Sequence, residues 1–105
     1  MSKYVYIAQV SITPDKEKEF NELYDSEHLP YVLEVPGVLS GRRFKLEWAD
    51  TDQMPQYLAI YELDDPMLPK SQAWITAADK GAWRKAIGPH MTVRRHGMFR
   101  KMKED

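Results

Sequence analysis

The amino-acid sequence predicts an α+β fold in which helices cover one antiparallel sheet, and three observations support it. Four segments alternate between two side-chain faces with the period of two that is typical of strands. Two further segments, one after the first strand and one before the last, are typical of helices. The 105 residues contain no repeat, low-complexity stretch or linker, so we expect a single domain over residues 1–105.

The first strand and the first helix follow each other directly. Residues 4–12 are rich in β-branched and aromatic side chains, and both alternating faces include apolar residues, which is typical of a strand covered on both sides. Thr13 suits a helix N-cap and Pro14 suits the first helical position. A stripe at spacings of three and four marks the buried face of the helix: Phe20, Leu23, Tyr24 and His28. Because Pro30 disfavours helical geometry in the residue before it, we expect the helix to end or kink there.

The rest of the chain completes the order β-α-β-β-α-β. Pro36-Gly37 predicts a turn, because proline fixes φ and glycine accepts a positive φ. Strands are predicted over residues 38–48, 57–63 and 92–102, and a helical region over residues 70–86 with an interruption near residues 79–81. This is the split βαβ order of ferredoxin-like folds, in which both helices lie on one face of a four-stranded antiparallel sheet.

The second face of this sheet is also predicted to be apolar. It would carry the following hydrophobic side chains: Val5, Ile7, Leu58, Ile60, Met98 and Met102. An open sheet with that much apolar surface needs a cover. We therefore expect a homodimer that forms through the sheet faces of two copies.

The composition excludes several functional classes. A net charge of -1 gives no basic surface for nucleic acid, and the absence of cysteine removes disulfides, thiolate nucleophiles and thiolate metal sites. No apolar run approaches the roughly 18–20 residues that span a bilayer, and the N-terminus lacks a secretory signal pattern. The three histidines lack the close spacing of zinc sites. We expect a soluble, cytoplasmic protein that has no nucleic-acid or membrane partner and uses neither metal nor cofactor.

His28 is the first candidate for chemistry. Histidine titrates near neutral pH and serves as a general acid or base. Tyr24, four residues earlier, shares its helical face and is a candidate for substrate contact. Asp25, three residues earlier, is placed to bond one ring nitrogen and fix the tautomer. The alternative is that His28 complements the helix dipole and caps free carbonyls at the helix end.

Two tyrosines on the predicted central strands are candidates for substrate contact. Tyr6 and Tyr61 lie on the same strand faces as the small residues Ala8 and Ala59, which would leave room above the sheet. A buried phenol beside such a space can donate a hydrogen bond to a developing oxyanion. The alternative is that both rings only pack in the sheet while their hydroxyl groups bond water or backbone.

Basic and aromatic residues farther along the chain supply further candidates. Arg42 and Arg43 point to opposite faces of their strand, and Arg42, in register with Phe44, is expected to be the inward one that holds a carboxylate or enolate. The alternative for the pair is an ion pair at the dimer edge and a solvated side chain.

The second helical region and the last strand add two tryptophans and two histidines. Trp74 and Trp83 would form an aromatic wall for a flat ring or a plain part of the core. His90, after Gly-Pro, would lie at the mouth of the pocket or be a simple turn residue. His96 is expected on an exposed or interface face.

Two segments together show a recognisable pattern: FNELYDSEHLPYVLEVPGVLSGRRF (residues 20–44) and YLAIYELDDP (residues 57–66). A helix-terminal His is followed by Pro, a V-P-G turn and a strand with paired Arg and an aromatic residue. With this pattern the chain resembles the dimeric α/β-barrel superfamily, specifically its EthD-like branch and related uncharacterised small proteins. The resemblance implies a substrate pocket between the helices and the sheet of each subunit, served by His, Tyr and Arg, and it favours a functional role for His28.

The candidates and the resemblance predict a cofactor-independent lyase, isomerase or cyclase. It would act on an aromatic, polyketide-like or lactone substrate by proton transfer next to a carbonyl. His28 would be the acid/base, Asp25 would orient it, Tyr61 or Tyr6 would support the oxyanion, and Arg42 would hold an anionic group. Two alternatives stay open: a non-catalytic binding protein that is accessory to a catabolic pathway for aromatic compounds, and a monooxygenase or haem-degrading protein.

Overall fold

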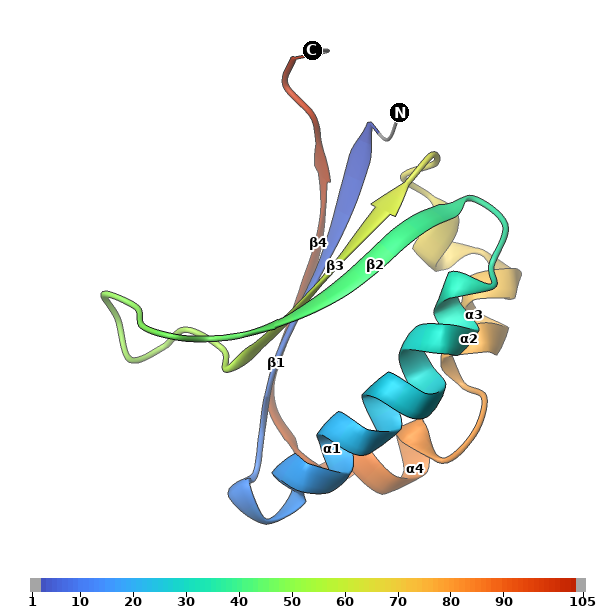
Figure 1. Cartoon of the computed structure of the whole chain (residues 1–105). Helices are drawn as coiled ribbons and strands as arrows, with labels where there is room; N and C mark the ends of the chain where they lie inside the picture. The colour runs from blue at the N-terminus through green and yellow to red at the C-terminus, as the bar shows by residue number, and fades with distance from the viewer. Residues whose placement is uncertain (1–2, 104–105) are drawn as a thin grey trace.

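The computed structural model describes residues 3–103 and contains a four-stranded antiparallel sheet with the helices on one face (Figure 1). The strands lie in the order β2-β3-β1-β4, so β1 and β3 are central. Their bounds are Tyr4–Ile12 (β1), Val38–Lys45 (β2), Tyr57–Leu63 (β3) and Met91–Arg100 (β4). The predicted α+β class and the ferredoxin-like β-α-β-β-α-β order are confirmed, and the predicted bounds of β1 and β3 agree at both ends.

The first helical segment continues beyond Pro30, where the sequence predicts its end or a kink. It consists of η1 (Pro14–Lys16), α1 (Glu17–Leu23), the π-helix η2 (Tyr24–His28) and α2 (Leu29–Leu33). A proline inside an α-helix removes one hydrogen bond and clashes with the preceding turn. The π-helical turn interrupts the α-helical ladder just before Pro30, so this proline lies in the first turn of α2, where proline is tolerated. Of the two expected outcomes, an end of the helix at Pro30 is therefore wrong, whereas the α-helical ladder is interrupted directly before it.

The second helical region is interrupted, as predicted. It consists of η3 (Leu68–Lys70), α3 (Gln72–Ala78), α4 (Trp83–Ile87) and η4 (Gly88–His90). Ser71 caps α3 by accepting a hydrogen bond from the backbone nitrogen of Trp74 at 3.3 Å. Between α3 and α4 the chain turns at Gly81, whose φ of 73° glycine adopts at no steric cost. Among residues 3–103, no helix combines the length and the apolar character that a membrane crossing requires.

A β-bulge in β2 reverses the faces that its residues were expected to occupy. The pairing with β3 shifts between Val38 and Ser40, so β2 contains one residue more than its partner strand at this point. Because side chains alternate with a period of two, one extra residue reverses the alternation beyond it. The side chain of Arg43 is only 15% exposed, whereas that of Arg42 is 67% exposed. The prediction that Arg42 is the inward residue is wrong, and Arg43 takes that place.

The core lies between the sheet and the helices. β3 shows the underlying alternation, because every second residue from Tyr57 to Leu63 is buried and the intervening ones are half-buried. The core residues come from the inner face of the central strands and the apolar faces of the helices: Ala8, Val10, Ile12, Phe20, Tyr24, Val32, Tyr57, Ala59, Tyr61, Leu63, Trp74, Trp83 and Ile87.

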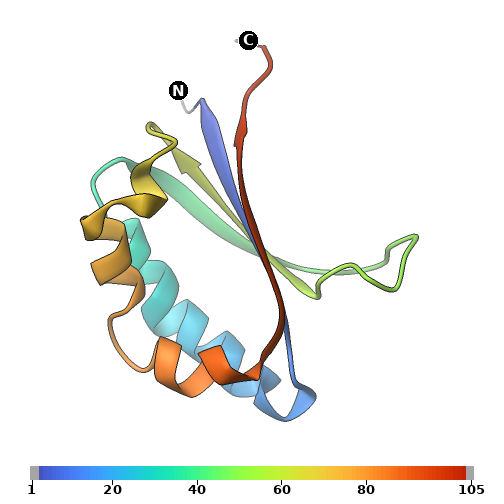
Figure 2. The ribbon, with the colours of Figure 1, turned by 180° about the vertical axis from the view of Figure 1, so that it is seen from behind.

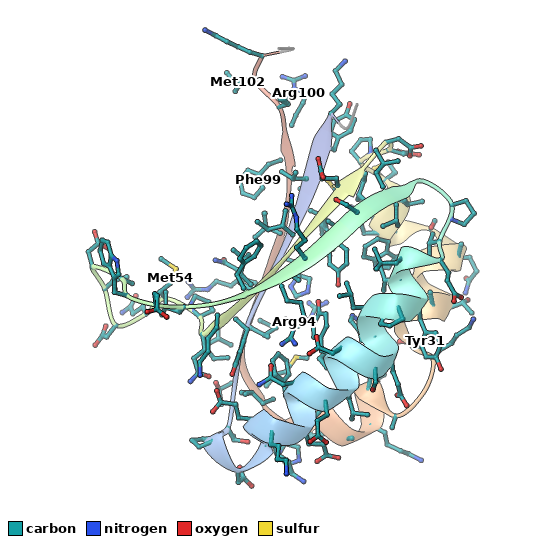
Figure 3. The ribbon with its side chains drawn as sticks, viewed as in Figure 1. Tyr31, Met54, Arg94, Phe99, Arg100 and Met102 are labelled. Carbon is teal, nitrogen blue, oxygen red and sulfur yellow. The ribbon has the colours of Figure 1, made fainter. Side chains whose placement is uncertain are left out.

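The opposite face of the sheet carries a group of apolar side chains, and no helix of residues 3–103 lies over it in either view of the ribbon (Figures 1 and 2). Ile7 and Ile60 are cross-strand partners on this face. Phe99 is 58% exposed and points away from the helices (Figure 3). Two residues that were expected here lie elsewhere, because Met98 packs against the core and Met102 follows the end of β4.

Gly41 lies where β2 approaches α2, and a side chain has no room there. A Cβ atom at Gly41 would lie 2.9 Å from Cδ1 of Tyr61 and 3.0 Å from Cδ1 of Leu29. We expect Gly41→Ala to lower the free energy of unfolding by about 1–3 kcal/mol, because overpacking forces the neighbours to move. Urea titration measures this change.

Gly88→Ala is the matched control for this substitution. A Cβ atom at Gly88 would have its nearest neighbour, Cγ of Arg84, at 4.0 Å. The control should change the free energy of unfolding by less than about 0.5 kcal/mol. Equal losses in the two variants would contradict the tight contact at Gly41.

Candidate functional site

A cavity of about 580 Å³ lies between the sheet and the helices. β1, β3, β4, η2, α3 and α4 all contribute to its wall, so the fold brings together parts of the chain that are far apart in sequence. Ala8 lines the cavity, whereas Ala59 is packed in the core. Several residues that were predicted to do chemistry or to contact a substrate share this wall: Tyr6, Tyr24, His28, Tyr61, Trp74 and Trp83.

The π-helix η2 places His28 in the cavity wall, and π-helical turns occur frequently at functional sites. The His28 ring is stacked on Trp83 with centroids 4.5 Å apart and meets the Tyr24 ring at 4.8 Å. Burial lowers the pKa of His28 to about 4, and a hydrogen bond with the backbone of Ala78 acts in the opposite direction. Within residues 3–103, Nδ1 of His28 is buried without a hydrogen-bond partner. His28 is therefore a neutral imidazole at neutral pH.

Asp25 does not orient His28, which corrects the expectation from the sequence. Its carboxylate is 66% exposed and accepts a hydrogen bond from Nη1 of Arg43 at 2.8 Å. Nη2 of Arg43 donates a second hydrogen bond, at 2.7 Å, to Oδ1 of Asn21. These contacts hold the guanidinium 4.4 Å from the centroid of the Tyr24 ring, within the range of a cation–π interaction. The bulge that turned Arg43 inward thus gave Asp25 a different partner.

Tyr24 and Tyr61 share a hydrogen bond in the interior. Their hydroxyl oxygens are 2.7 Å apart, and either group can be the donor. Burial raises the pKa of Tyr24 to about 12 and that of Tyr61 well above its usual range, while the charge of Arg43 lowers both. Both phenols are therefore protonated at neutral pH. One hydroxyl donates to the other, and the accepting hydroxyl keeps a proton of its own to donate.

Aromatic rings make up much of the remaining wall. Tyr6 is the cross-strand partner of Tyr61, and its ring meets that of Trp74 edge-on with centroids 5.5 Å apart. Trp74 and Trp83 line the cavity and are also buried, with 8% and 7% of their surface exposed. The two roles that the sequence left open for these tryptophans, core and aromatic wall, are therefore combined.

Two other predicted contact residues lie outside the cavity wall. Arg42 is on the opposite face of the sheet, where its Nη2 lies 3.8 Å from a carboxylate oxygen of Glu62. His90 ends η4, and its backbone oxygen accepts a hydrogen bond from the backbone nitrogen of Thr13 at 3.1 Å. The chain around His90 does reach the cavity, through Gly88, Pro89 and Met91. Neither Arg42 nor His90 is placed to contact a ligand in the cavity.

His96 and Arg94 line the cavity, although neither was predicted to do so. His96 was expected on an exposed or interface face, and it is exposed, yet it lies on the inner face: it is the cross-strand partner of Ala8, and its ring lies 5.7 Å from the Tyr6 ring. Burial lowers the pKa of His96 to about 4 and the charge of Arg94 lowers it further, although part of His96 stays open to solvent. Arg94, His96 and Met98 alternate along β4 and therefore share one face. Met98 was expected on the outer face, and assigning it to the inner face would have placed Arg94 and His96 in the cavity wall.

The cavity wall contains few side chains of the kinds that bind metal ions. Among residues 3–103, no cluster of three or more histidine and acidic side chains has the geometry for one. His28 and His96 are the imidazoles in the wall, and each could supply a nitrogen ligand to the metal of a planar cofactor. The rest of the wall offers aromatic and aliphatic contacts.

No protein-family model and no curated protein sequence matches this chain. Solved structures match it over almost its whole length. An EthD-family protein from Bacillus halodurans is 17% identical, with 94% of this chain and 99% of that chain covered and a TM-score of 0.66. SnoaB, a cofactor-independent oxygenase from Streptomyces nogalater, is 14% identical, with 99% and 97% covered and a TM-score of 0.66.

A third solved structure is described as a dimeric ferredoxin-like protein of unknown function, from Thermobifida fusca. It is 16% identical, with 95% of this chain and 92% of that chain covered and a TM-score of 0.67. These likenesses show that the chain has the ferredoxin-like fold of EthD-type and related proteins. The resemblance in fold that the sequence implied is confirmed.

The buried neutral state of His28 predicts that the fold loses stability in mild acid. The pKa of His28 is about 4 in the fold and near the ordinary 6.5 in the unfolded chain. Between these values the unfolded state binds the additional proton, so the free energy of unfolding falls as the pH decreases. His28 contributes at most about 1.4 kcal/mol to this loss for each pH unit. Urea titrations between about pH 7 and pH 4 should show a shallower pH dependence for His28→Gln.

His90→Gln is the control for this measurement, because His90 lies outside the cavity wall. It should keep the pH dependence of the wild type. An unchanged dependence in His28→Gln would contradict the buried neutral imidazole.

Proposed function

We propose that the protein is a small-molecule enzyme that moves a proton next to a carbonyl group of a flat aromatic or polyketide-like compound without a bound cofactor. The observation that carries this proposal is the neutral His28 in the cavity wall, beside the hydroxyl pair of Tyr24 and Tyr61. A neutral imidazole accepts a proton, and a phenol donates to the oxygen on which negative charge develops. Decarboxylation, dehydration, isomerisation and ring closure all use such an enolate-like anion.

The size and lining of the cavity support a flat substrate. Its volume of about 580 Å³ is in the usual range of small-molecule sites. Trp74 and Trp83 provide broad apolar surfaces, and Tyr6 adds an edge. Burial of ring surface stabilises a complex by about 25 cal/mol per Å², so a planar ring system would draw most of its binding free energy from these walls.

The low pKa of His28 limits which substrates it can deprotonate. Moving a proton from a carbon acid with a pKa of about 9 to an imidazole with a pKa of about 4 costs roughly 7 kcal/mol. Attraction between the imidazolium and the enolate offsets part of this cost, and hydrogen bonds from the tyrosine pair offset more. The proposed substrate is therefore an acidic carbon compound, activated by two carbonyl groups or by a ring that becomes aromatic on ionisation.

A second candidate reaction uses the same proton transfer but adds O₂. An enolate-like anion can transfer one electron to O₂, and the resulting carbon radical and superoxide then combine through a new C–O bond. The peroxide anion that forms takes back the proton held by His28, which gives a hydroperoxide. SnoaB, whose fold this chain shares, is a cofactor-independent oxygenase, and this analogy of fold is the observation that favours oxygenation.

Non-catalytic binding is the candidate from another class. The observation in its favour is the weak basicity of His28, because an imidazole with a pKa of about 4 is a poor general base until a ligand raises that value. A binding protein would hold the same aromatic compounds in the same cavity. It would leave the exchange of their acidic protons unchanged.

His28→Gln tests whether the cavity is catalytic. The probe is anthrone, a flat three-ring carbon acid whose acidic protons exchange with deuterium in D₂O under nitrogen, as followed by NMR. We expect the wild type to accelerate the exchange and His28→Gln to reduce this acceleration by about 10²–10⁴-fold, the usual contribution of a general acid–base group. Product that forms only in air, with His28-dependent O₂ uptake, would favour the oxygenase.

His90→Gln is the matched control and should exchange anthrone protons at the rate of the wild type. Circular dichroism must show the same fold for all three proteins. Exchange by His28→Gln at the rate of the wild type would refute the catalytic role, and anthrone binding without accelerated exchange would favour the binding protein.

The apolar outer face of the sheet supports a homodimer as part of this proposal. Its central pair, Ile7 and Ile60, is half-buried, and Phe99 is more than half exposed. The Thermobifida fusca protein of the same fold is described as dimeric. Two copies that meet through this face would remove the apolar surface from water.

Ile7→Glu tests the dimer. The cross-strand partners of Ile7 are Ile60 and Gly97, which offer a carboxylate no partner to replace its water, so we expect the variant to be monomeric in analytical ultracentrifugation. Thr76→Glu, on the exposed side of α3, adds the same charge and should keep the mass of the wild type. A monomeric wild type, or an Ile7→Glu variant that stays dimeric, would contradict the proposed interface.

A further inference from the structure

The charged side chains around the cavity are all of one sign. Arg84 and Arg94 line it, and none of the lining residues in the described part of the chain carries a carboxylate. Arg84 is paired with Asp79, whose Oδ1 lies 2.6 Å from Nη2 of the arginine. The wall therefore keeps one uncompensated positive charge, that of Arg94.

Arg94 extends from β4 into the space between the sheet and the helices (Figure 3). Within residues 3–103, its side chain has neither a hydrogen bond nor an ion pair. Its charge lowers the pKa of Tyr6 and that of His96, and the rings of these two residues are 5.7 Å apart. Arg94 thus shares the cavity wall with two further polar groups, and His96 is the next residue along β4 on the same face. Arg94 has no acid to neutralise its charge within residues 3–103.

The chemistry of these groups selects the kind of ligand. A guanidinium forms two parallel hydrogen bonds with a planar carboxylate, and the protonated hydroxyl of Tyr6 can donate one more. Trp74 lies against Tyr6, so the surface next to the positive charge is aromatic. We propose that the cavity binds a flat aromatic carboxylate, with the carboxylate held by Arg94 and Tyr6 and the rings against Trp74. This inference rests on the proposed function and adds the charged group of its substrate.

A carboxylate at Arg94 would also change the acid/base group. His96 is near enough for its charge to lower the pKa of His28, so an anion in the same region acts on His28 with the opposite sign. The other charges that reach His28 are those of Arg43, which lowers its pKa, and Asp79, which raises it. The bound substrate would thus supply some of the basicity that the free cavity lacks.

The test compares a charged and a neutral ligand of the same shape. The probes are 2-naphthoate and 2-naphthamide, and isothermal titration calorimetry measures their binding to the wild type and to Arg94→Gln. We expect Arg94→Gln to weaken naphthoate binding by about 10–100-fold, the usual effect of losing a charge-assisted pair of hydrogen bonds. Naphthamide binding should change by less than about 2-fold, because the amide has no charge to lose.

Arg42→Gln is the matched control, because it removes the same charge from the opposite face of the sheet. It should leave the binding of both probes unchanged. The inference is overturned if Arg42→Gln weakens naphthoate as much as Arg94→Gln does, if Arg94→Gln weakens both probes equally, or if the wild type binds neither.

The naphthoate experiment and the anthrone experiment test the binding of a carboxylate and the catalytic function separately. Naphthoate binding that depends on Arg94, without His28-dependent proton exchange, supports this inference and refutes the catalytic function. Exchange that depends on His28, with naphthoate binding that is the same in Arg94→Gln, refutes this inference alone. NMR titration adds an independent readout, because naphthoate should raise the pKa of His28 in the wild type and leave it unchanged in Arg94→Gln.

Discussion

The hydrogen bond between the hydroxyl groups of Tyr24 and Tyr61 joins the helical layer to the sheet, and the candidate site is arranged around it. Tyr61 belongs to a central strand and Tyr24 to the π-helix, so their contact fixes this turn against the sheet. His28 follows on the same turn and is held between Tyr24 and Trp83. Because a buried hydroxyl without a partner costs about 1–3 kcal/mol, this bond strongly favours one position of the helices over the sheet.

Most of the fold follows from local patterns that a single sequence contains. The alternation of side chains gave the bounds of β1 and β3, and the break near Gly81 was visible as a glycine within a helical region. The bulge between Val38 and Ser40 was not visible, because an extra residue in one strand has meaning only beside its partner. That one residue decided which of two adjacent arginines lies on the inner face of the sheet, where Arg43 contacts Asp25 and the Tyr24 ring.

The residues of the candidate site likewise fall into those that local sequence patterns predict and those that depend on contacts between distant parts of the chain. The residues on the helical stripe and on the central strands were predicted, because burial alone marks them. Arg94 and His96 escaped prediction because the inner face of β4 depends on its register with β1, which no local pattern records. The role expected of Asp25 failed for a related reason. Spacing along a helix cannot reveal that a residue on a distant strand, Arg43, competes for its carboxylate.

The cavity wall is formed partly by central strands of the sheet and partly by an edge strand. Tyr6 and Tyr61 belong to β1 and β3, which have a neighbour on both sides, whereas Arg94 and His96 belong to β4 at the edge of the sheet. A change on an edge strand disturbs hydrogen bonds with one neighbour instead of two. Substitutions in β4 can therefore alter the charge that the cavity accepts while the paired tyrosines and His28 keep their places. In evolution or in design, a new ligand preference could thus be acquired on this scaffold without rebuilding its interior.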